Sequence, residues 1–498
     1  MKQKLKNLLI EKILKNGEKY SNIKIFEDSK NSITYAELLK ISFSNINKIK
    51  LIKDDYIPIL VDRNLNSIIA ILSIILSKKT FCPISPSLPN KRINKITQIL
   101  NSKHIINCSQ KKLSELSTLK EIKLNKINSV KKFRKIKINF SEKFNNFNDI
   151  FYILFTSGST GSPKGVKLSY ANIHNTLLWS RKYLRWKNHK IGIATQLSFD
   201  ISMFDVFSGL FFNVPSFLFS NPSDPFISQK EINKFKVTSI FSVPAFFSNF
   251  IKFDLLKNKN KLKRIISGGD FFPPKDILYW KKNTLSEVFN VWGPTETSIV
   301  NSMYKIQKKD IKNLQLGKNQ PVGKSHKEME INIVKNRKIL KRKQIGEICM
   351  SGKCVAAGYL GHIKNQRNFI NLKGKKSYLT GDVGYFDKKG NLFILGRKDN
   401  TIKILGYRVD ALEIQNTVNK IDYITSSLAF VLEDYGHKTL CLAIETKKAI
   451  SIERIKKILI QNLPKYSIPK KIKFFDKFPI NFNYKIDQKK IKSAFNEK

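Results

Sequence analysis

Residues 151–170 read FYILFTSGSTGSPKGVKLSY, and this stretch decides how the rest of the sequence is interpreted. The apolar and aromatic run 151–155 predicts a buried strand. Hydroxyl side chains, glycines and Lys164 follow, and a helix-like pattern begins after Ser169. Glycines let backbone amides approach an anion closely, while the hydroxyls and the lysine add donors and charge. The stretch therefore favours a phosphate-binding loop between a strand and a helix. A surface loop of the same composition is the ordinary alternative.

The loop matches neither common phosphate-binding pattern. In a Walker A loop the lysine follows a glycine and precedes Ser or Thr, whereas Lys164 lies between Pro163 and Gly165. The G-x-G-x-x-G pattern of dinucleotide-binding proteins is also absent. What the loop binds therefore has to be inferred from the rest of the chain.

The patterns around the loop predict an α/β protein. From about residue 34 to residue 241, short apolar runs alternate with amphipathic helical runs, which is typical of mainly parallel sheets. Around 346–359 and 390–395 the pattern becomes strand, turn, strand. A new unit with helices near 411–421 and 452–462 follows the charged run that ends at Asn400. We expect a large domain of residues 1–398 and a small domain of residues 399–498, joined near Asp399.

The chain has 498 residues, of which 41% are hydrophobic, so more than one folded core is expected. Its 91 Lys and Arg against 38 Asp and Glu give a formal net charge of +53. Nucleic-acid binding is one interpretation of this charge. Because the lysines are spread along the whole chain, a general compositional drift is favoured, and no nucleic-acid partner is expected. The charge should still attract acidic partners.

The cysteines and the apolar segments indicate a cytoplasmic protein. Five scattered cysteines include no C-x-x-C pair, which fits a reducing compartment. The N-terminus lacks the long apolar core of a signal peptide. The most apolar helical run, residues 68–76, is far shorter than the ~20 residues of a membrane span.

The order T-S-G-S-T-G-x-P-K-G resembles the signature loop of the adenylate-forming (AMP-binding) enzymes. These include acyl-CoA synthetases, luciferases and the amino-acid adenylation domains of peptide synthetases. Other landmarks occur in the family's order and cover nearly the whole chain: TYAEL at 34–38, FCPISP at 81–86 with Pro89 and Arg92, NVWGPTET at 290–297, YLTGD at 378–382, GRKD at 396–399, Lys403, Gly406, Arg408, Glu413, LPKY at 463–466 and KID at 485–487.

The resemblance implies a fold and a reaction. The fold has a large N-terminal domain of two stacked α/β subdomains plus a small β-barrel, followed by a small mobile α+β C-terminal domain. In the implied reaction, a carboxylate attacks the α-phosphate of ATP to give an acyl-adenylate and pyrophosphate. A thiol then displaces AMP and gives a thioester.

The resemblance also assigns the nucleotide half of the site. The loop would hold the β- and γ-phosphates, Glu296 would bind Mg²⁺, and Thr295 would contact the α-phosphate. Trp292, where the family usually has Tyr, would stack on adenine. Lys485 would bridge the substrate carboxylate and the α-phosphate, although Tyr484 replaces the glycine that usually precedes this lysine. The remaining residues implied for the nucleotide are Thr156, Ser157, Gly158, Ser159, Thr160, Gly161, Lys164, Asn290, Asp382 and Arg397.

The acid half of the site is implied by the stretch QLSFDISMFD at 196–205, which resembles the F-D-x-S element of amino-acid-activating members. There the Asp, here Asp200, pairs with the α-ammonium of the substrate; an N-cap role is the alternative. Gly268-Gly269-Asp270 stands where D-alanine ligases tend to have Cys-Gly-Glu. The other implied pocket residues are Phe204, Ser267, Gly269, Val291, Ile299 and Val300.

The sequence leaves three functions open. The favoured one is a ligase that loads an amino acid onto a separate, acidic, phosphopantetheinylated carrier protein, with Asp399 as the hinge and Gly406 beside the thiol tunnel. D-Alanine–carrier protein ligases have this size and plan. The second is a fatty- or aryl-acid–CoA ligase on the same fold. The third, remote alternative is a basic nucleic-acid-binding protein without catalysis.

Overall fold

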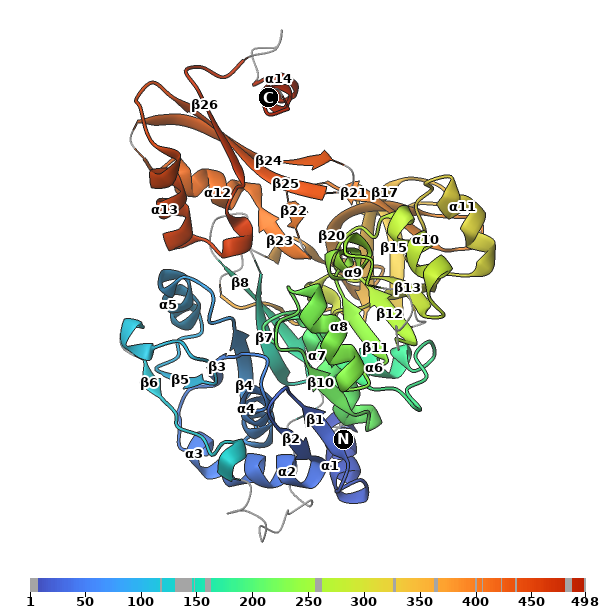
Figure 1. Ribbon diagram of the computed structural model, residues 1–498. Coiled ribbons are helices and arrows are strands. Elements are labelled where there is room, and N and C mark those ends of the chain that lie inside the picture. The colour runs from blue at the N-terminus through green and yellow to red at the C-terminus, as the bar shows by residue number, and fades with distance from the viewer. Residues whose placement is uncertain are drawn as a thin grey trace. The chain divides into compact units, whose positions relative to one another are not determined.

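The computed structural model describes residues 8–116, 119–129, 146, 148–156, 163–255, 262–325, 328–361, 366–398, 401–404, 406–421, 423–434, 437–479 and 486–496. The chain folds into two compact units, whose elements are labelled in Figure 1. The first unit comprises Met1–Pro86, Thr97–Leu154 and Gly165–Lys398. The second comprises Ser87–Ile96, Phe155–Lys164 and Asp399–Lys498. The second unit thus combines two short internal segments with the C-terminal part of the chain.

The first unit contains an eight-stranded sheet in the order β14-β13-β12-β11-β9-β10-β1-β2. The six strands from β13 to β1 run parallel, whereas the edge strands β14 and β2 run antiparallel to their neighbours. Strands β11 and β12 are buried along their whole length, as expected for a sheet covered on both faces. The strands span Lys24–Glu27 (β1), Ser32–Thr34 (β2), Ile191–Ile193 (β9), Ser216–Leu218 (β10), Ser239–Ser242 (β11), Arg264–Ser267 (β12), Glu287–Trp292 (β13) and Ser302–Lys305 (β14).

Helices follow or precede these strands as the sequence pattern predicts. Helix α7 is apolar on nearly all sides, and every residue from Asp200 to Phe211 is buried. The helices that accompany this sheet span Leu8–Lys19 (α1), Tyr35–Ser44 (α2), Ile46–Lys50 (α3), Tyr170–Ser180 (α6), Asp200–Phe212 (α7), Pro225–Lys234 (α8), Pro244–Lys252 (α9), Pro274–Asn283 (α10) and Ile311–Gln315 (α11).

A second, seven-stranded sheet has the order β18-β8-β7-β4-β3-β5-β6 and is parallel from β7 to β6. The quoted run 151–155 lies in its strand β7, as predicted, and Phe151 of β7 packs against Phe207 of α7 with ring centroids 4.8 Å apart. The elements are Tyr56–Leu60 (β3), Leu65–Leu76 (α4), Thr80–Ile84 (β4), Asn90–Ile99 (α5), His104–Asn107 (β5), Leu113–Glu115 (η1), Lys120–Glu121 (β6), Ile150–Thr156 (β7), Lys164–Ser169 (β8) and Gly358–Tyr359 (β18).

A third sheet is antiparallel and gives the β-rich section that the sequence predicted. Its order is β16-β15-β17-β20-β19, and β21 also pairs with β20. This pairing places Asp382 of β20 opposite Arg397 of β21. The strands span Met329–Lys335 (β15), Lys338–Ile339 (β16), Gly346–Gly352 (β17), Phe369–Leu372 (β19), Lys375–Phe386 (β20) and Leu392–Arg397 (β21).

The second unit is an α+β arrangement. A buried ion pair joins its internal segment to its C-terminal part: Arg92 Nη1 of α5 lies 2.5 Å from Glu413 Oε1 of α12. The rings of Tyr407 and Tyr466 stack with centroids 4.0 Å apart. Its C-terminal elements are Thr401–Ile404 (β22), Tyr407–Asp410 (β23), Ala411–Val418 (α12), Ile424–Asp434 (β24), His437–Thr446 (β25), Ile452–Asn462 (α13), Lys465–Ser467 (η6), Lys471–Phe475 (β26) and Gln488–Ala494 (α14).

The predicted fold class is confirmed: α/β layers with mainly parallel sheets, a smaller β-rich part and a C-terminal α+β part. Among the described residues, no helix combines the length and apolar character that crossing a membrane requires.

Candidate active site

The candidate site lies where the parallel strands of the eight-stranded sheet end. Strand β12 ends at Ser267, β13 ends at Trp292, and α7 begins at Asp200 after β9. A short 3₁₀ helix, η3 (Thr295–Thr297), follows β13. Ligands bind outside the carboxyl ends of the strands in open α/β sheets, because loops and helix N-termini gather there. The topology therefore brings Asp200, Ser267 and Trp292 to the same edge of this sheet.

Three residues predicted to contact the nucleoside lie in direct contact. Trp292 Nε1 donates a hydrogen bond to Asp382 Oδ2 over 2.8 Å. Arg397 Nη1 donates to the other oxygen, Asp382 Oδ1, over 2.7 Å. Asp382 is 2% exposed, so its negative charge is buried and balanced by the guanidinium. These bonds fix both the carboxylate and the indole edge.

Backbone carbonyl groups hold the side-chain amide of Asn290. Its Nδ2 donates to the carbonyl oxygen of Pro321 over 3.1 Å and is 3.5 Å from that of Gln320. The amide is therefore held by the loop that follows α11. The role of Asn290 in binding the nucleotide stays a prediction.

Glu296 is a buried carboxylate with a tyrosine partner. It lies on η3, is 1% exposed, and accepts a hydrogen bond from Tyr359 Oη over 2.8 Å. Tyr359 Oη is also 3.0 Å from Tyr378 Oη. We did not predict the role of Tyr359 from the sequence. The sequence feature that pointed to Tyr359 was its position at the end of the strand, turn, strand pattern of residues 346–359.

The site fits Mg²⁺ as an ion shared with a bound phosphate. Mg²⁺ usually takes one or two carboxylates and completes its octahedron with phosphate oxygens and water. Glu296 would supply one such carboxylate. Within the described ranges, no group of three His, Cys, Asp or Glu side chains could hold a metal by itself.

Asp200 and Thr295 lie in contact, which the sequence did not predict. Thr295 Oγ1 donates a hydrogen bond to Asp200 Oδ2 over 2.6 Å. Asp200 is the first residue of α7 and is 7% exposed. The N-cap residue of the helix is Phe199, which makes no side-chain capping bond. The carboxylate is therefore near the positive end of the helix dipole.

The residues around the predicted acid-binding position are closely packed. The rings of Phe204 and Phe241 meet edge to face with centroids 5.6 Å apart. A Cβ placed on Gly268 would be 2.6 Å from Val291 Cγ2 and 3.3 Å from Phe241 Cε2, so these groups already fill the space around Gly268. Ser267 Oγ is buried without a hydrogen-bond partner among the described residues.

The turn after η3 is strained at Ser298 and at the predicted pocket residue Ile299. Ser298 has φ 66° and Ile299 has φ 74°, and both are buried. Left-handed φ is unusual for a β-branched residue, and such outliers concentrate at functional sites. Thr176 Oγ1 donates to the carbonyl oxygen of Ser298 over 3.0 Å and so supports the turn. The next residue, Val300, is 1% exposed.

Several predicted residues lie outside the described residues: Ser157, Gly158, Ser159, Thr160, Gly161, Asp399, Tyr484 and Lys485. At the borders of the loop, Thr156 is the last residue of β7 and Lys164 the first residue of β8. Thr156 Oγ1 is buried without a described hydrogen-bond partner. Gly406, between β22 and β23, and Gly269 have φ of 79° and 83°, which favour glycine.

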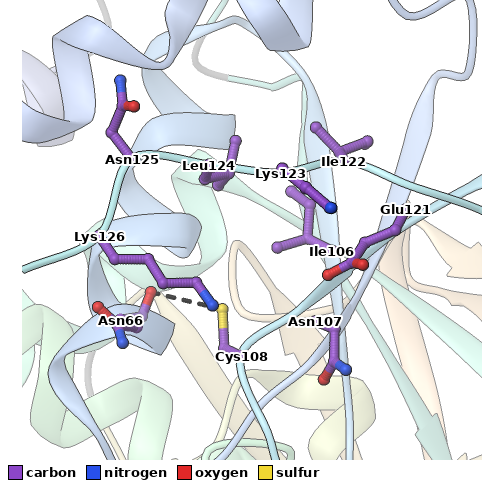
Figure 2. A pocket seen from close by; sticks show the side chains of 10 residues that line it. All are labelled: Asn66, Ile106, Asn107, Cys108, Glu121, Ile122, Lys123, Leu124, Asn125 and Lys126. Carbon is purple, nitrogen blue, oxygen red and sulfur yellow. Dashed lines mark hydrogen bonds between the residues drawn. The ribbon is translucent and has the colours of Figure 1, made fainter. Parts of the chain in front are cut away.

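A cavity of about 220 Å³ elsewhere in the first unit contains none of the predicted site residues (Figure 2). Strand β6 and the segment after it line one part, and Asn66 and Cys108 line another. Cys108 Sγ donates to the carbonyl oxygen of Asn66 over 3.5 Å. Burial raises the pKa of this thiol to about 12, so it stays protonated at neutral pH and is a poor nucleophile.

Residues 14–360 match the family model described as AMP-binding enzyme. Bacitracin synthase 3 of Bacillus licheniformis is 28% identical over 448 residues, which is 88% of this chain but 7% of that synthase. The chain thus spans less than a tenth of that relative. The D-alanine–D-alanyl carrier protein ligase of Bacillus licheniformis is 27% identical over 505 residues, which is 97% of this chain and 99% of that ligase.

Solved structures share the fold. The adenylation domain AlmE of Vibrio cholerae, in complex with glycyl-adenosine-5'-phosphate, has a TM-score of 0.83 at 20% identity and covers 99% of each chain. The o-succinylbenzoate CoA synthetase of Bacillus subtilis has a TM-score of 0.84 at 19% identity, with 97% of this chain and 98% of that chain covered. At these identities the likeness establishes the fold alone.

Proposed function

The chain belongs to the AMP-binding enzyme family, and we propose that it activates a small amino acid with ATP as an acyl-adenylate, with release of pyrophosphate. The acyl group then passes to the phosphopantetheine thiol of a separate carrier protein. The family membership rests on the match over residues 14–360. The amino acid, the carrier and the individual residue roles are our proposal.

Asp200 is the observation that carries the amino-acid assignment. The Asp200 carboxylate is 7% exposed and lies at the edge of the sheet where the acid is proposed to bind, and a buried carboxylate is a suitable partner for an opposite charge. The α-ammonium of an amino acid supplies the opposite charge, whereas a fatty or aryl acid supplies none. Asp200 also lies beside Thr295, next to the residue proposed for Mg²⁺. The acid and the α-phosphate would therefore meet at this point.

The packing around Gly268 supports a small side chain on the substrate. Phe204, Phe241 and Val291 already occupy the space between α7 and the ends of β11 and β13. Glycine and alanine of either hand fit such a pocket better than larger amino acids. The Gly268-Gly269-Asp270 run leaves D-alanine as one candidate among these.

ATP is the nucleotide that the family uses, and the proposed site provides for it. Glu296 would hold Mg²⁺, which neutralises phosphate charge when bound. Asp382 and Arg397 would receive the ribose, and Asn290 and Trp292 the adenine. The loop 156–165 and Lys485 would bind the phosphates and the reacting carboxylate. Asp399 would be the hinge, Gly406 would lie beside the thiol, and the five unpaired cysteines fit a cytoplasmic location.

A CoA ligase is the second candidate for the thiol step. The carrier assignment is supported by the match to the D-alanine–D-alanyl carrier protein ligase, which covers 99% of that ligase. The CoA assignment is supported by the fold likeness to the o-succinylbenzoate CoA synthetase. The net charge of +53 would steer an acidic carrier toward the enzyme and favours the first.

ATP–pyrophosphate exchange with a panel of acids tests the proposal. The panel contains glycine, both enantiomers of alanine, larger amino acids, benzoate and fatty acids. We expect exchange with small amino acids, and Asp200→Asn should cost about 2–5 kcal/mol of transition-state stabilisation for them. Exchange with fatty or aryl acids alone would establish the CoA-ligase alternative instead. A second assay then measures whether the acyl group passes to a carrier protein or to CoA, and so identifies the thiol that accepts it.

A further inference from the structure

We propose that Thr295 is a positioning residue for amino-acid recognition, whose hydroxyl orients the Asp200 carboxylate toward the α-ammonium of the substrate. This inference rests on the proposed function. It gives Thr295 a role in choosing the acid, in addition to the α-phosphate contact implied by the family resemblance.

The contact joins two segments that are 95 residues apart. Thr295 Oγ1 donates to Asp200 Oδ2 over 2.6 Å, a short distance typical of a hydroxyl bound to a carboxylate. Asp200 begins α7 and Thr295 begins η3, and both elements leave the same edge of the sheet. Side chains placed by such rigid elements are oriented before the substrate arrives.

Hydrogen bonds fix the backbone at Thr295 and at the residue that follows it. The carbonyl oxygen of Thr295 accepts a bond from the Ser298 amide over 3.2 Å, which closes η3. The next residue, Glu296, is held through its side chain by Tyr359 and through its carbonyl oxygen by the amide of Ala356. The hydroxyl of Thr295 is therefore aimed by the protein rather than by a ligand.

The carboxylate can accept this hydroxyl and an ammonium together. Two carboxylate oxygens offer about four acceptor positions, so a carboxylate can accept several donors at once. A hydrogen bond from Thr295 restrains rotation of the Asp200 side chain. A fixed carboxylate discriminates an acid with an amino group from its deaminated counterpart better than a mobile one does.

The test compares Thr295→Val and Thr295→Ser in the full-length chain by ATP–pyrophosphate exchange. Glycine is paired with acetate, and alanine with propionate. Thr295→Val removes the hydroxyl at nearly constant volume and should raise the KM for the amino acid about tenfold or more. Because Thr295 is also assigned to the α-phosphate, some loss is expected with every acid, and the inference requires that the loss with the amino acid exceed the loss with its deaminated counterpart by about tenfold. Thr295→Ser, which keeps the hydroxyl, should restore the preference for the amino acid.

An equal loss with amino acids and deaminated acids would assign Thr295 to the phosphate alone and overturn the inference. Thr284→Val is the matched control, because the Thr284 hydroxyl also donates a single bond, to the carbonyl oxygen of Trp280 over 2.8 Å, away from this site. It should leave every KM unchanged.

A double-mutant cycle of Thr295→Val and Asp200→Ala, each of which removes one partner of the bond, measured by urea unfolding, tests the bond without any substrate. Non-additive effects on the free energy of unfolding are expected, while additive effects would refute the inference. If the wild-type chain exchanges with no amino acid, the proposed function fails. The cycle still decides whether Thr295 holds Asp200.

Discussion

Two aspartates on α7, five positions apart, lie in different environments. Asp200 accepts the Thr295 hydroxyl, whereas Asp205 Oδ2 is buried without a hydrogen-bond partner among the described residues. Asp205 is 1% exposed, and burial raises its pKa well above the ordinary value. Burial disfavours the charged form, so the Asp205 carboxyl retains its proton to higher pH than an exposed one.

Asp205→Asn should remove a pH-dependent cost of folding. Between the unfolded pKa near 4 and the raised folded pKa, the native state binds more protons than the unfolded state. Stability from this residue is therefore complete below about pH 4 and declines as the pH rises. Relative to wild type, the variant should gain about 1–3 kcal/mol between pH 5 and pH 8, measured by urea unfolding.

A difference between the two proteins that does not change with pH would contradict this account. Asp310→Asn is the matched control, because the Asp310 carboxylate accepts hydrogen bonds from Tyr304 Oη at 3.1 and 3.0 Å. That carboxylate is already satisfied, so its amide variant should be less stable than wild type.

Single residues also show how much of the site could be predicted from the sequence. Asp200 and Thr295 were each assigned a ligand, and their contact with each other was missed. A hydrogen bond across 95 residues leaves no local pattern in the chain. The same holds for Tyr359, whose partner Glu296 lies 63 residues away.

At the scale of elements, strand β18 places Tyr359 in contact with Glu296 of the 3₁₀ helix η3. The tyrosine fixes Glu296, so it should tune the affinity for Mg²⁺ as residues behind a metal ligand do. Tyr359→Phe should raise the Mg²⁺ concentration for half-maximal exchange by roughly 10–100-fold. The stabilisation of the chain by ATP against heat should also require more Mg²⁺.

The control for this change is Tyr304→Phe, which removes a phenol that donates to Asp310 on the 3₁₀ helix η4 (Lys308–Asp310). It should leave the Mg²⁺ dependence unchanged. If both tyrosine variants behave alike, Tyr359 has no particular role at the metal.

Helices and strands with a clear hydrophobic periodicity were predicted well, whereas the strained turn after η3 was not. The apolar runs and helical periodicities indicate the strands and helices because burial imposes those periods. The left-handed turn at Ser298 and Ile299 could not be predicted, since a β-branched residue disfavours that conformation. Its support comes from Thr176 on α6, which is distant in sequence.

At the scale of the whole molecule, the second unit is assembled from distant parts of the chain. Arg92 and Glu413 are separated by 321 residues, and their side chains are 7% and 3% exposed. The alternation of helices and strands predicted the α/β class. It could not reveal that residues 87–96 join the C-terminal part, because that depends on this ion pair and on packing.

Breaking the ion pair should destabilise the chain more than replacing it. Arg92→Met leaves the Glu413 carboxylate buried and unpaired, which should cost about 3–5 kcal/mol. The double variant Arg92→Met with Glu413→Leu removes both charges and should recover most of this loss. Chemical unfolding of the full chain measures both changes. A double variant as unstable as the single one would show that packing, rather than charge, governs this contact.

Trp292 has a consequence for how the molecule can be observed. Indole emission responds to nearby charge, and this indole is hydrogen-bonded to the Asp382 carboxylate beside Arg397. A nucleotide that reorganises these charges would alter the emission, so the chain carries a built-in optical reporter among its four tryptophans. ATP titration should change the fluorescence of the wild-type chain. Trp292→Tyr should abolish that change while leaving the signal of the other three tryptophans.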